Sequence, residues 1–322
     1  MPDINVGGQA VIEGVMMRSR DRVATAVRVP NGEILVKTEP YTSLTHRRKA
    51  LSLPIVRGAI SFVEMLILGI RTLNFSAEVA MEEAEKEEAV RNGEEFKPKR
   101  KRTNNVLLAL TAVFALALGI AIFFFLPLAI SEWFNISRDA VGFNLIAGAI
   151  RLGIFLVYVW GISMFGEFRK VFQYHGAEHK SIYTYELGRD LTPEVAASQT
   201  RFHPRCGTSF ILIVALLAIL VYSVSDSIFA VITGHAPSLP ARFAVHFSLL
   251  PLVAGVSYEL LKLSGRTRDN AVTRVMIKPG LWLQKITTKE PSFDQLEVAI
   301  AALEASLGVT ESKLTSRRVP VS

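Results

Sequence analysis

The sequence has only one cysteine, Cys206, among 322 residues, so an intramolecular disulfide is excluded. Charged residues make up only 20% of the chain and are missing from several long stretches. Residues 1–30 lack a central apolar run, which argues against a cleavable signal peptide. What is abundant is apolar: 50% of the residues are hydrophobic and the mean hydropathy is +0.33. We therefore expect a membrane protein rather than an ordinary soluble one.

Four stretches are long and apolar enough to cross a bilayer as helices. They are residues 106–130, 140–165, 209–232 and 241–263. A fifth stretch, residues 53–73, places Arg57, Glu64 and Arg71 seven residues apart, and therefore on one helical face. We expect it to be an amphipathic helix that lies in the interface or re-enters the membrane, and a fifth crossing is the alternative.

Basic residues predict the orientation of these helices. With four crossings, all of the 36 Lys and Arg lie on one side except Arg138, Arg151 and Arg242. Because cytoplasmic loops carry the excess of positive charge, this side is expected to be the cytoplasm. The protein is therefore predicted to be multi-pass, with both termini cytoplasmic.

The predicted fold is a polytopic α-helical membrane protein with four transmembrane helices, one interfacial or re-entrant amphipathic helix and a small cytoplasmic α+β portion. The expected segments, in order, are a β-rich N-terminal unit (1–52), an amphipathic helix followed by an acidic helix and a basic stretch (53–105), transmembrane helices one and two (106–165), a region with histidine and cysteine motifs (166–207), transmembrane helices three and four (208–263), and a C-terminal region with an amphipathic helix and a disordered tail (264–322).

Turn and glycine motifs indicate the structure of the N-terminal unit. Within residues 22–39, two stretches of alternating polarity are joined by Pro30, Asn31 and Gly32, which predicts a β-hairpin. The preceding stretch VGGQAVIEGVMMR, residues 6–18, is rich in glycine but has no following Gly-Lys-Ser/Thr. A phosphate-binding loop is therefore disfavoured, and we expect a strand whose glycines allow close approach of another backbone.

The polar segments beside the membrane carry further signals. Residues 76–96 predict a charged helix, and the following KPKRKR is expected to contact anionic lipid headgroups rather than nucleic acid. The second transmembrane helix is expected to continue into the cytoplasm and to stop at Gly188.

The C-terminal region divides into two parts. IKPGLWLQKITTKEP, residues 277–291, is expected to be a strand or a loop. Ser292 and Gln295 fit a capping box that opens an amphipathic helix.

The stretch QYHGAEHKSIY, residues 173–183, carries the strongest chemical signal. On a helix, His175 and His179 lie one turn apart on one face, a spacing that suits two imidazoles on one metal ion. Glu178 lies beside them and could act as a general base. The pattern His-x-x-Glu-His is the inverted form of a zinc metallopeptidase motif.

A catalytic zinc needs about three protein ligands and one open position. His203 and Cys206, in RFHPRCGTSF at residues 201–210, are candidates for the third ligand, and Glu259 is a possible additional one. All three are expected near the depth of His179. A structural role is the alternative, because Cys206 could be a small buried residue and Glu259 could extend toward the interface.

A second polar set lies within the predicted spans. Arg151, Asp226 and His246 have similar depths, and a charge inside a membrane is costly unless it is paired. We expect Arg151 to pair with Asp226, with His246 nearby. A buried clamp between helices is favoured over a proton path.

Four motifs together resemble the YqhQ-like family of bacterial membrane proteins: GGQAVIEGVMMR, YHGAEHK, RFHPRCGTSF and PGLWLQKITTKEP. The resemblance covers nearly the whole chain. The family has no established function and often carries the label of predicted metal-dependent enzyme. The resemblance therefore implies a bacterial plasma-membrane location and a metal role for His175, Glu178, His179, His203 and Cys206.

The leading functional expectation is a divalent metal site, with zinc as the metal, at the cytoplasmic membrane face. It would serve a metal-dependent hydrolase acting on a lipid headgroup or another membrane-adjacent substrate. The alternative is a non-enzymatic scaffold or accessory factor that docks the ribosome or the protein-insertion machinery, with a structural His/Cys cluster. The expected partners are a bilayer with anionic headgroups and a protein at the cytoplasmic face, with nucleic acid only through the ribosome.

Overall fold

Short alternating strands near the N-terminus form a sheet. A computed structural model describes residues 6–93, 105–134, 141–266, 270–309 and 316–319. Four antiparallel strands follow one another in order, namely β1 (Gly7–Val11), β2 (Gly14–Arg18), β3 (Arg22–Arg28) and β4 (Ile34–Pro40). The predicted hairpin is confirmed, because Gly32 takes a φ of 88° in the turn between β3 and β4. Two short helices, α1 (Leu44–Arg47) and η1 (Lys49–Ser52), follow the sheet.

The end of the chain adds a fifth strand to this sheet. β5 (Ser316–Val319) pairs in parallel with β4, beginning with Ser316 opposite Ile34. The prediction of a disordered tail is therefore wrong for this strand, because β4 offers it an open edge. The rest of the predicted tail lies outside the described residues.

Helices cover one face of the sheet. They are α6 (Gly166–Glu186), α7 (Pro193–Ala197) and α11 (Phe293–Leu307), and α11 begins at the predicted capping box of Ser292 and Gln295. The buried core joins sheet residues such as Val15 and Met17 to Leu296 and Ile300 of α11. The sheet and the three helices therefore form two packed layers around one core, which holds α6 in place.

One long helix covers part of the opposite face. α2 (Val56–Arg91) has 36 residues and merges the two helices that were predicted for residues 53–73 and 76–96. Its buried Leu68 packs on Met16 and Val23 of the sheet. At its N-terminal end, Gly58 lies so close to Gly255 that an added Cβ would be 2.9 Å from the Gly255 Cα. α2 thus bridges the sheet and the apolar helices.

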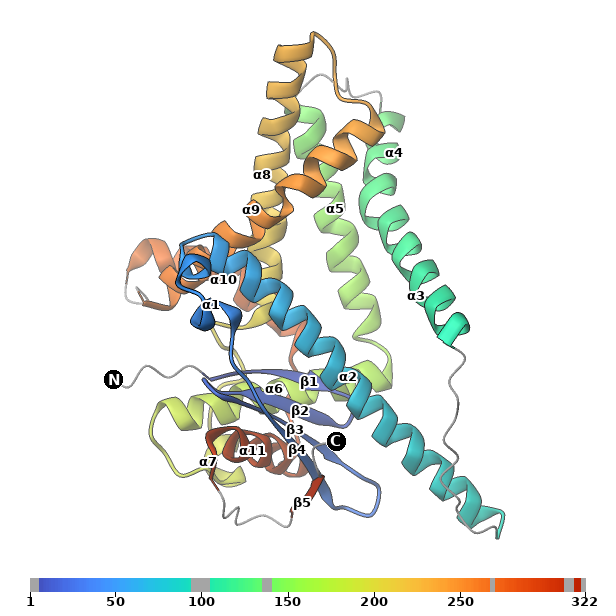
Figure 1. Cartoon of the computed structure of the whole chain (residues 1–322), viewed down its shortest axis with the longest axis vertical. Helices are drawn as coiled ribbons and strands as arrows, with labels where there is room; N and C mark the ends of the chain where they lie inside the picture. The colour runs from blue at the N-terminus through green and yellow to red at the C-terminus, as the bar shows by residue number, and fades with distance from the viewer. Residues whose placement is uncertain (1–5, 94–104, 135–140, 267–269, 310–315, 320–322) are drawn as a thin grey trace.

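The four predicted apolar helices are present. Within the described residues, four helical stretches are long and apolar enough to cross a membrane: Val113–Ser131, Gly142–Ile162, Gly207–Thr233 and Leu239–Ser264. They belong to the run α3 (Asn105–Ile120), η2 (Ala121–Phe125) and α4 (Leu126–Trp133), and to α5 (Val141–Ile162), α8 (Gly207–Thr233) and α9 (Leu239–Arg266). Figure 1 shows these helices at one end of the molecule and the sheet with α6, α7 and α11 at the other. α2 is not among the four, and its position in the interface stays a prediction.

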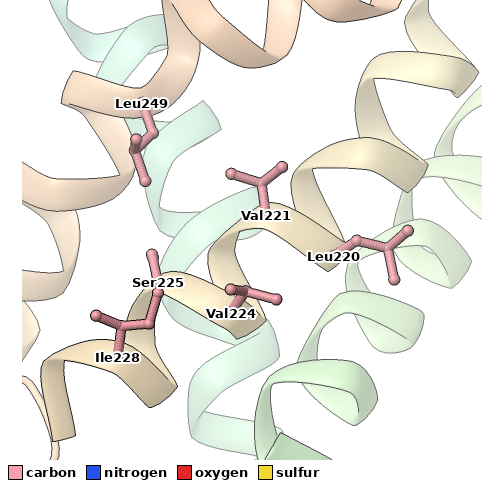
Figure 2. A pocket seen from close by; sticks show the side chains of 6 residues that line it. All are labelled: Leu220, Val221, Val224, Ser225, Ile228 and Leu249. Carbon is pink, nitrogen blue, oxygen red and sulfur yellow. The ribbon is translucent and has the colours of Figure 1, made fainter. Parts of the chain in front are cut away.

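The outer surface of these helices is apolar. Between α8 and α9 a shallow groove of about 340 Å³ exposes almost only carbon. Figure 2 shows its lining, with Leu249 on α9 facing five residues of α8: Leu220, Val221, Val224, Ser225 and Ile228. Such a surface suits hydrocarbon rather than water.

Two predictions about the polar segments are wrong. The second apolar helix does not continue into the histidine-bearing segment, because α5 ends at Ile162 and α6 begins after an extended Phe165. The segment predicted as strand or loop, residues 277–291, is helical up to Thr287 as part of α10 (Ala271–Thr287), and only its last four residues form a loop. Pro279 and Gly280 misled the prediction, although neighbouring elements stabilise a helix that contains both. The predicted stop at Gly188 is confirmed by its φ of 62°.

Candidate functional site

A close contact at Gly176 positions the histidine face of α6. A Cβ at this position would lie 2.1 Å from the carbonyl oxygen of Lys289, so only glycine fits. The backbone N–H of Lys289 also donates to the carbonyl of Phe172 at 2.8 Å. α6 is therefore held tightly against the segment that follows α10.

Three potential ligand atoms converge on this face. One ligand atom each of His175, His179 and Cys206 lies within 4.8 Å of the other two. The ring centroids of His175 and His179 are 4.5 Å apart, and the Nε2 of His175 is 3.1 Å from the Cys206 Sγ. The predicted convergence of the two motifs is confirmed, with Cys206 as the third member. The group could hold a metal ion.

Hydrogen bonds fix the tautomer of both histidines. The Nδ1 of His175 lies 2.8 Å from the carbonyl oxygen of Thr287, and the Nδ1 of His179 lies 2.6 Å from the carbonyl oxygen of Arg201. A carbonyl oxygen can only accept, so Nδ1 carries the proton in each ring and, in the neutral ring, Nε2 carries the lone pair. Metal-binding histidines are oriented in this way by their outer partners.

Side-chain hydrogen bonds hold the segments next to the carbonyls that orient the histidines. Arg201 donates to the carbonyl oxygen of Thr288 at 2.5 Å and to its hydroxyl at 2.8 Å. The fully buried Gln284 accepts from the backbone N–H of His203 and donates to its carbonyl, both at 2.8 Å. The sequence analysis missed Gln284, because its segment was predicted as strand or loop. A helical assignment of this segment would have placed Gln284 one turn before Thr287 and so indicated it as a candidate.

Cys206 occupies the start of the third apolar helix. It is the N-cap of α8, and its Sγ accepts from the backbone N–H of Thr208 at 3.4 Å. Burial opposes ionisation, but the neighbouring His175 and His179 outweigh it and hold the pKa of the Cys206 thiol well below its usual range. Burial likewise lowers the pKa of His175, but Cys206 and Glu178 raise it to about 9. The thiolate, which is the form that binds metals, is therefore favoured.

Glu178 is buried next to the glycine-rich strand. Burial raises the pKa of its carboxyl, against the lowering effects of His175 and His179 and of a hydrogen bond from the Gly8 backbone. A Cβ on Gly8 would lie 2.9 Å from the Glu178 Cγ and 2.7 Å from the Met16 carbonyl oxygen, and the second contact confirms the predicted close approach of another backbone. Within the described part of the chain, no ion pair of Glu178 is found. Its carboxyl thus interacts electrostatically with His175 and His179 without being held in an ion pair among the described residues.

Two predicted ligands are not members of the group of three converging atoms. The Nε2 of His203 is 3.3 Å from Glu186, which also pairs with Arg205, and the ring centroids of His203 and His179 are 5.6 Å apart. Glu259 forms a bidentate ion pair with Arg57 of α2, whose Nε and Nη2 lie 2.6 and 2.5 Å from the two carboxylate oxygens. Glu259, predicted as a possible additional ligand, is therefore not brought to this group, because the packing of α2 on α9 engages both of its oxygens.

The ion pair between the apolar helices also differs from the prediction. Asp226 contacts Arg242 at 2.7 Å and His246 at 2.9 Å, and all three side chains are buried. The sequence-based prediction paired Asp226 with Arg151 and gave no partner to Arg242, which lies in the first turn of α9.

Arg151 instead satisfies a backbone carbonyl. Its Nε donates to the carbonyl oxygen of Phe123 at 2.7 Å. Pro127 has no N–H, so the carbonyl four residues before it lacks its helical partner. The guanidinium supplies the missing donor, which explains a charge at this depth without a carboxylate.

The chain matches known proteins over most of its length. A family model described as "Protein of unknown function (DUF1385)" matches residues 53–309. The "Uncharacterized protein YqhQ" of Bacillus subtilis (strain 168) is 33% identical over 305 residues, which cover 94% of this chain and 92% of that protein. No solved structure matches. The chain is therefore a member of the YqhQ-like DUF1385 family, whose function is unknown.

Proposed function

We propose that this protein is a membrane-embedded, metal-dependent hydrolase whose zinc site is formed by His175, His179 and Cys206. The supporting observation is that both imidazoles donate Nδ1–H to backbone carbonyls, which leaves Nε2 on the side of the Cys206 thiol. Two oriented imidazoles and a thiolate are a donor set that suits zinc.

The arrangement favours a catalytic site over a structural one. Three protein ligands leave one position open, whereas structural zinc sites are closed by four. The proposed ligand set leaves out His203, because its Nε2 lies 3.3 Å from Glu186. A zinc ion in this group would supply a bound water with a pKa lowered to about 7.

Glu178 would act as the general base beside this site. Its carboxylate accepts a proton from the attacking water and passes that proton to the leaving group. The raised pKa of the buried Glu178 carboxyl suits both tasks, because a base with a pKa nearer to neutrality can also return the proton.

The location argues for a substrate at the membrane surface. Cys206 directly precedes the apolar helix α8, so the proposed site lies where the chain enters the membrane. The positive charge around it supports a cytoplasmic orientation in a bacterial plasma membrane. A lipid headgroup or a membrane-adjacent peptide is the proposed substrate class.

The orientation can be tested with introduced cysteines. Arg189→Cys lies on the exposed turn after α6 and His235→Cys on the exposed turn between α8 and α9, while the native Cys206 is buried. A membrane-impermeant maleimide should label His235→Cys in intact cells and Arg189→Cys only after lysis. The reverse pattern would refute the orientation.

A scaffold function is the second candidate. His179 is only 1% exposed and Cys206 only 5%, so the cluster is enclosed, as a structural site would be. In this case the site would hold α6 and α8 together, and the basic face would dock a protein partner such as the ribosome or the insertion machinery.

Metal analysis of the purified protein tests the proposal. We expect about one zinc per chain in the unmodified protein and in the exposed-histidine control His46→Ala, and loss of zinc in His179→Ala. Loss of zinc in His203→Ala as well would indicate a closed four-ligand site and favour the scaffold. An unmodified protein that remains metal-free after incubation with zinc would refute both metal sites.

A further inference from the structure

α10 presents one exposed face that the proposed function does not use. Val275, Lys278, Trp282 and Lys285 follow one another at spacings of three, four and three residues, which places them on one side of the helix. All four are exposed, with Trp282 at 68% and Val275 at 63%. The opposite side, which includes Gly280, is buried.

A groove runs along this exposed face. Its volume is about 330 Å³, and it is lined by Phe202, Lys278, Leu281, Trp282 and Lys285. The two lysines flank Trp282 at positions four before and three after it. An apolar floor between two ammonium groups fits a ligand that combines a negative charge with hydrocarbon.

The groove lies at the depth where an apolar helix begins. A Cβ on Gly280 would be 2.7 Å from the Ser209 Cβ, so α10 packs directly on the first turn of α8. Figure 1 shows α10 between the apolar helices and the sheet. If α8 crosses the membrane, the exposed face of α10 is at the level of the lipid phosphates, where tryptophan is enriched.

We infer that this groove binds the headgroup of an anionic glycerophospholipid from the surrounding bilayer. Lys278 and Lys285 contact the phosphate region, and the upper acyl chain packs on Trp282 and Leu281. Charge complementarity selects the lipid class, because each lysine near an anionic membrane surface strengthens binding to that surface about fivefold. A protein partner is disfavoured, because it would have to supply carboxylates for both lysines, and nothing in the groove selects such a partner.

The lipid site adjoins the proposed metal site. Phe202 lines the groove, and the neighbouring Arg201 carbonyl orients His179. A lipid in the groove therefore contacts Phe202, the residue next to the Arg201 carbonyl that accepts a hydrogen bond from His179. The lipid proposal needs the membrane insertion of α8 but not the metal, so the two proposals fail independently.

Lipid-selective quenching of Trp282 tests the inference. Trp133→Phe and Trp160→Phe leave Trp282 as the single tryptophan of the chain's three. The full-length variant is placed in nanodiscs that contain an equal fraction of either phosphatidylglycerol or phosphatidylcholine brominated near the headgroup. We expect clearly stronger quenching by the anionic lipid, and Lys278→Gln with Lys285→Gln should bring the two lipids to equal quenching.

A matched control pair separates local from general electrostatics. Arg20→Gln with Arg189→Gln removes the same charge from exposed turns away from α10 and should keep the preference. Equal quenching by both lipids in the starting variant, or a preference that survives the double lysine substitution, overturns the proposal. Absence of quenching by either lipid also overturns it, because a second copy or another protein would then cover the groove. Zinc content measured on the same samples shows whether the metal site is intact.

Discussion

Replacing Gly176 by alanine should disrupt the candidate site without touching any of its ligands. The added Cβ would lie 2.1 Å from the Lys289 carbonyl oxygen, whereas real Cβ atoms essentially never approach within 3.0 Å, so one side of the contact must move by about 1 Å. Neither side can move freely. Gly176 follows His175 directly on α6, and Lys289 follows the segment whose Thr287 carbonyl orients that histidine.

The size of this displacement sets two expected effects. Inserting one methyl group into a packed interior costs about 1–3 kcal/mol, which should lower the unfolding temperature by a few degrees. Metal–ligand distances tolerate deviations of about 0.2 Å, so a shift of about 1 Å exceeds what the three-ligand group can absorb. We therefore expect Gly176→Ala to remain folded while losing most of its zinc.

The assay compares Gly176→Ala with Gly166→Ala. Gly166 opens the same helix, and a Cβ there meets nothing within 4 Å. Thermal unfolding and metal content are measured on both purified variants in detergent. Unchanged stability and zinc content in Gly176→Ala would refute the tight contact and the geometric argument built on it, while losses in Gly166→Ala as well would show that the effect is not specific.

Three further predictions follow from contacts elsewhere in the chain. Removing Asp226 or Arg242 alone should cost about 3–5 kcal/mol of unfolding free energy, whereas the double variant should cost less than the sum, and strict additivity in a double-mutant cycle would exclude the pair. Glu259→Gln should keep its zinc, because the structure engages Glu259 with an arginine, and metal analysis would contradict this if zinc were lost. Arg151→Met should cost about 1–3 kcal/mol of unfolding free energy, because it leaves the Phe123 carbonyl without a donor. The cost should be much smaller in a Pro127→Ala background, where a restored backbone N–H can reach that carbonyl. Equal costs in both backgrounds would argue against this role of Arg151.

Patterns of short range were enough to predict most local features. The β-hairpin depends on the turn at Gly32, the α11 start on the capping box of Ser292, and the end of α6 on Gly188, and each of these is a contact within a few residues. The failures involve competition between local preference and packing. Pro279 and Gly280 lower the helix propensity of α10, yet the approach of Gly280 to Ser209 stabilises the helix by close packing.

The sequence by itself determined the four apolar helices, the side on which positive charge gathers and the helical spacing of His175 and His179, because hydropathy, charge and period are properties of the chain alone. Only the tertiary structure decided which partner each polar group finds. It brings Cys206 rather than Glu259 to the histidines, and Arg242 rather than Arg151 to Asp226. Similar depth allows many pairs, and the choice among them depends on how the helices rotate and pack, which no single helix specifies.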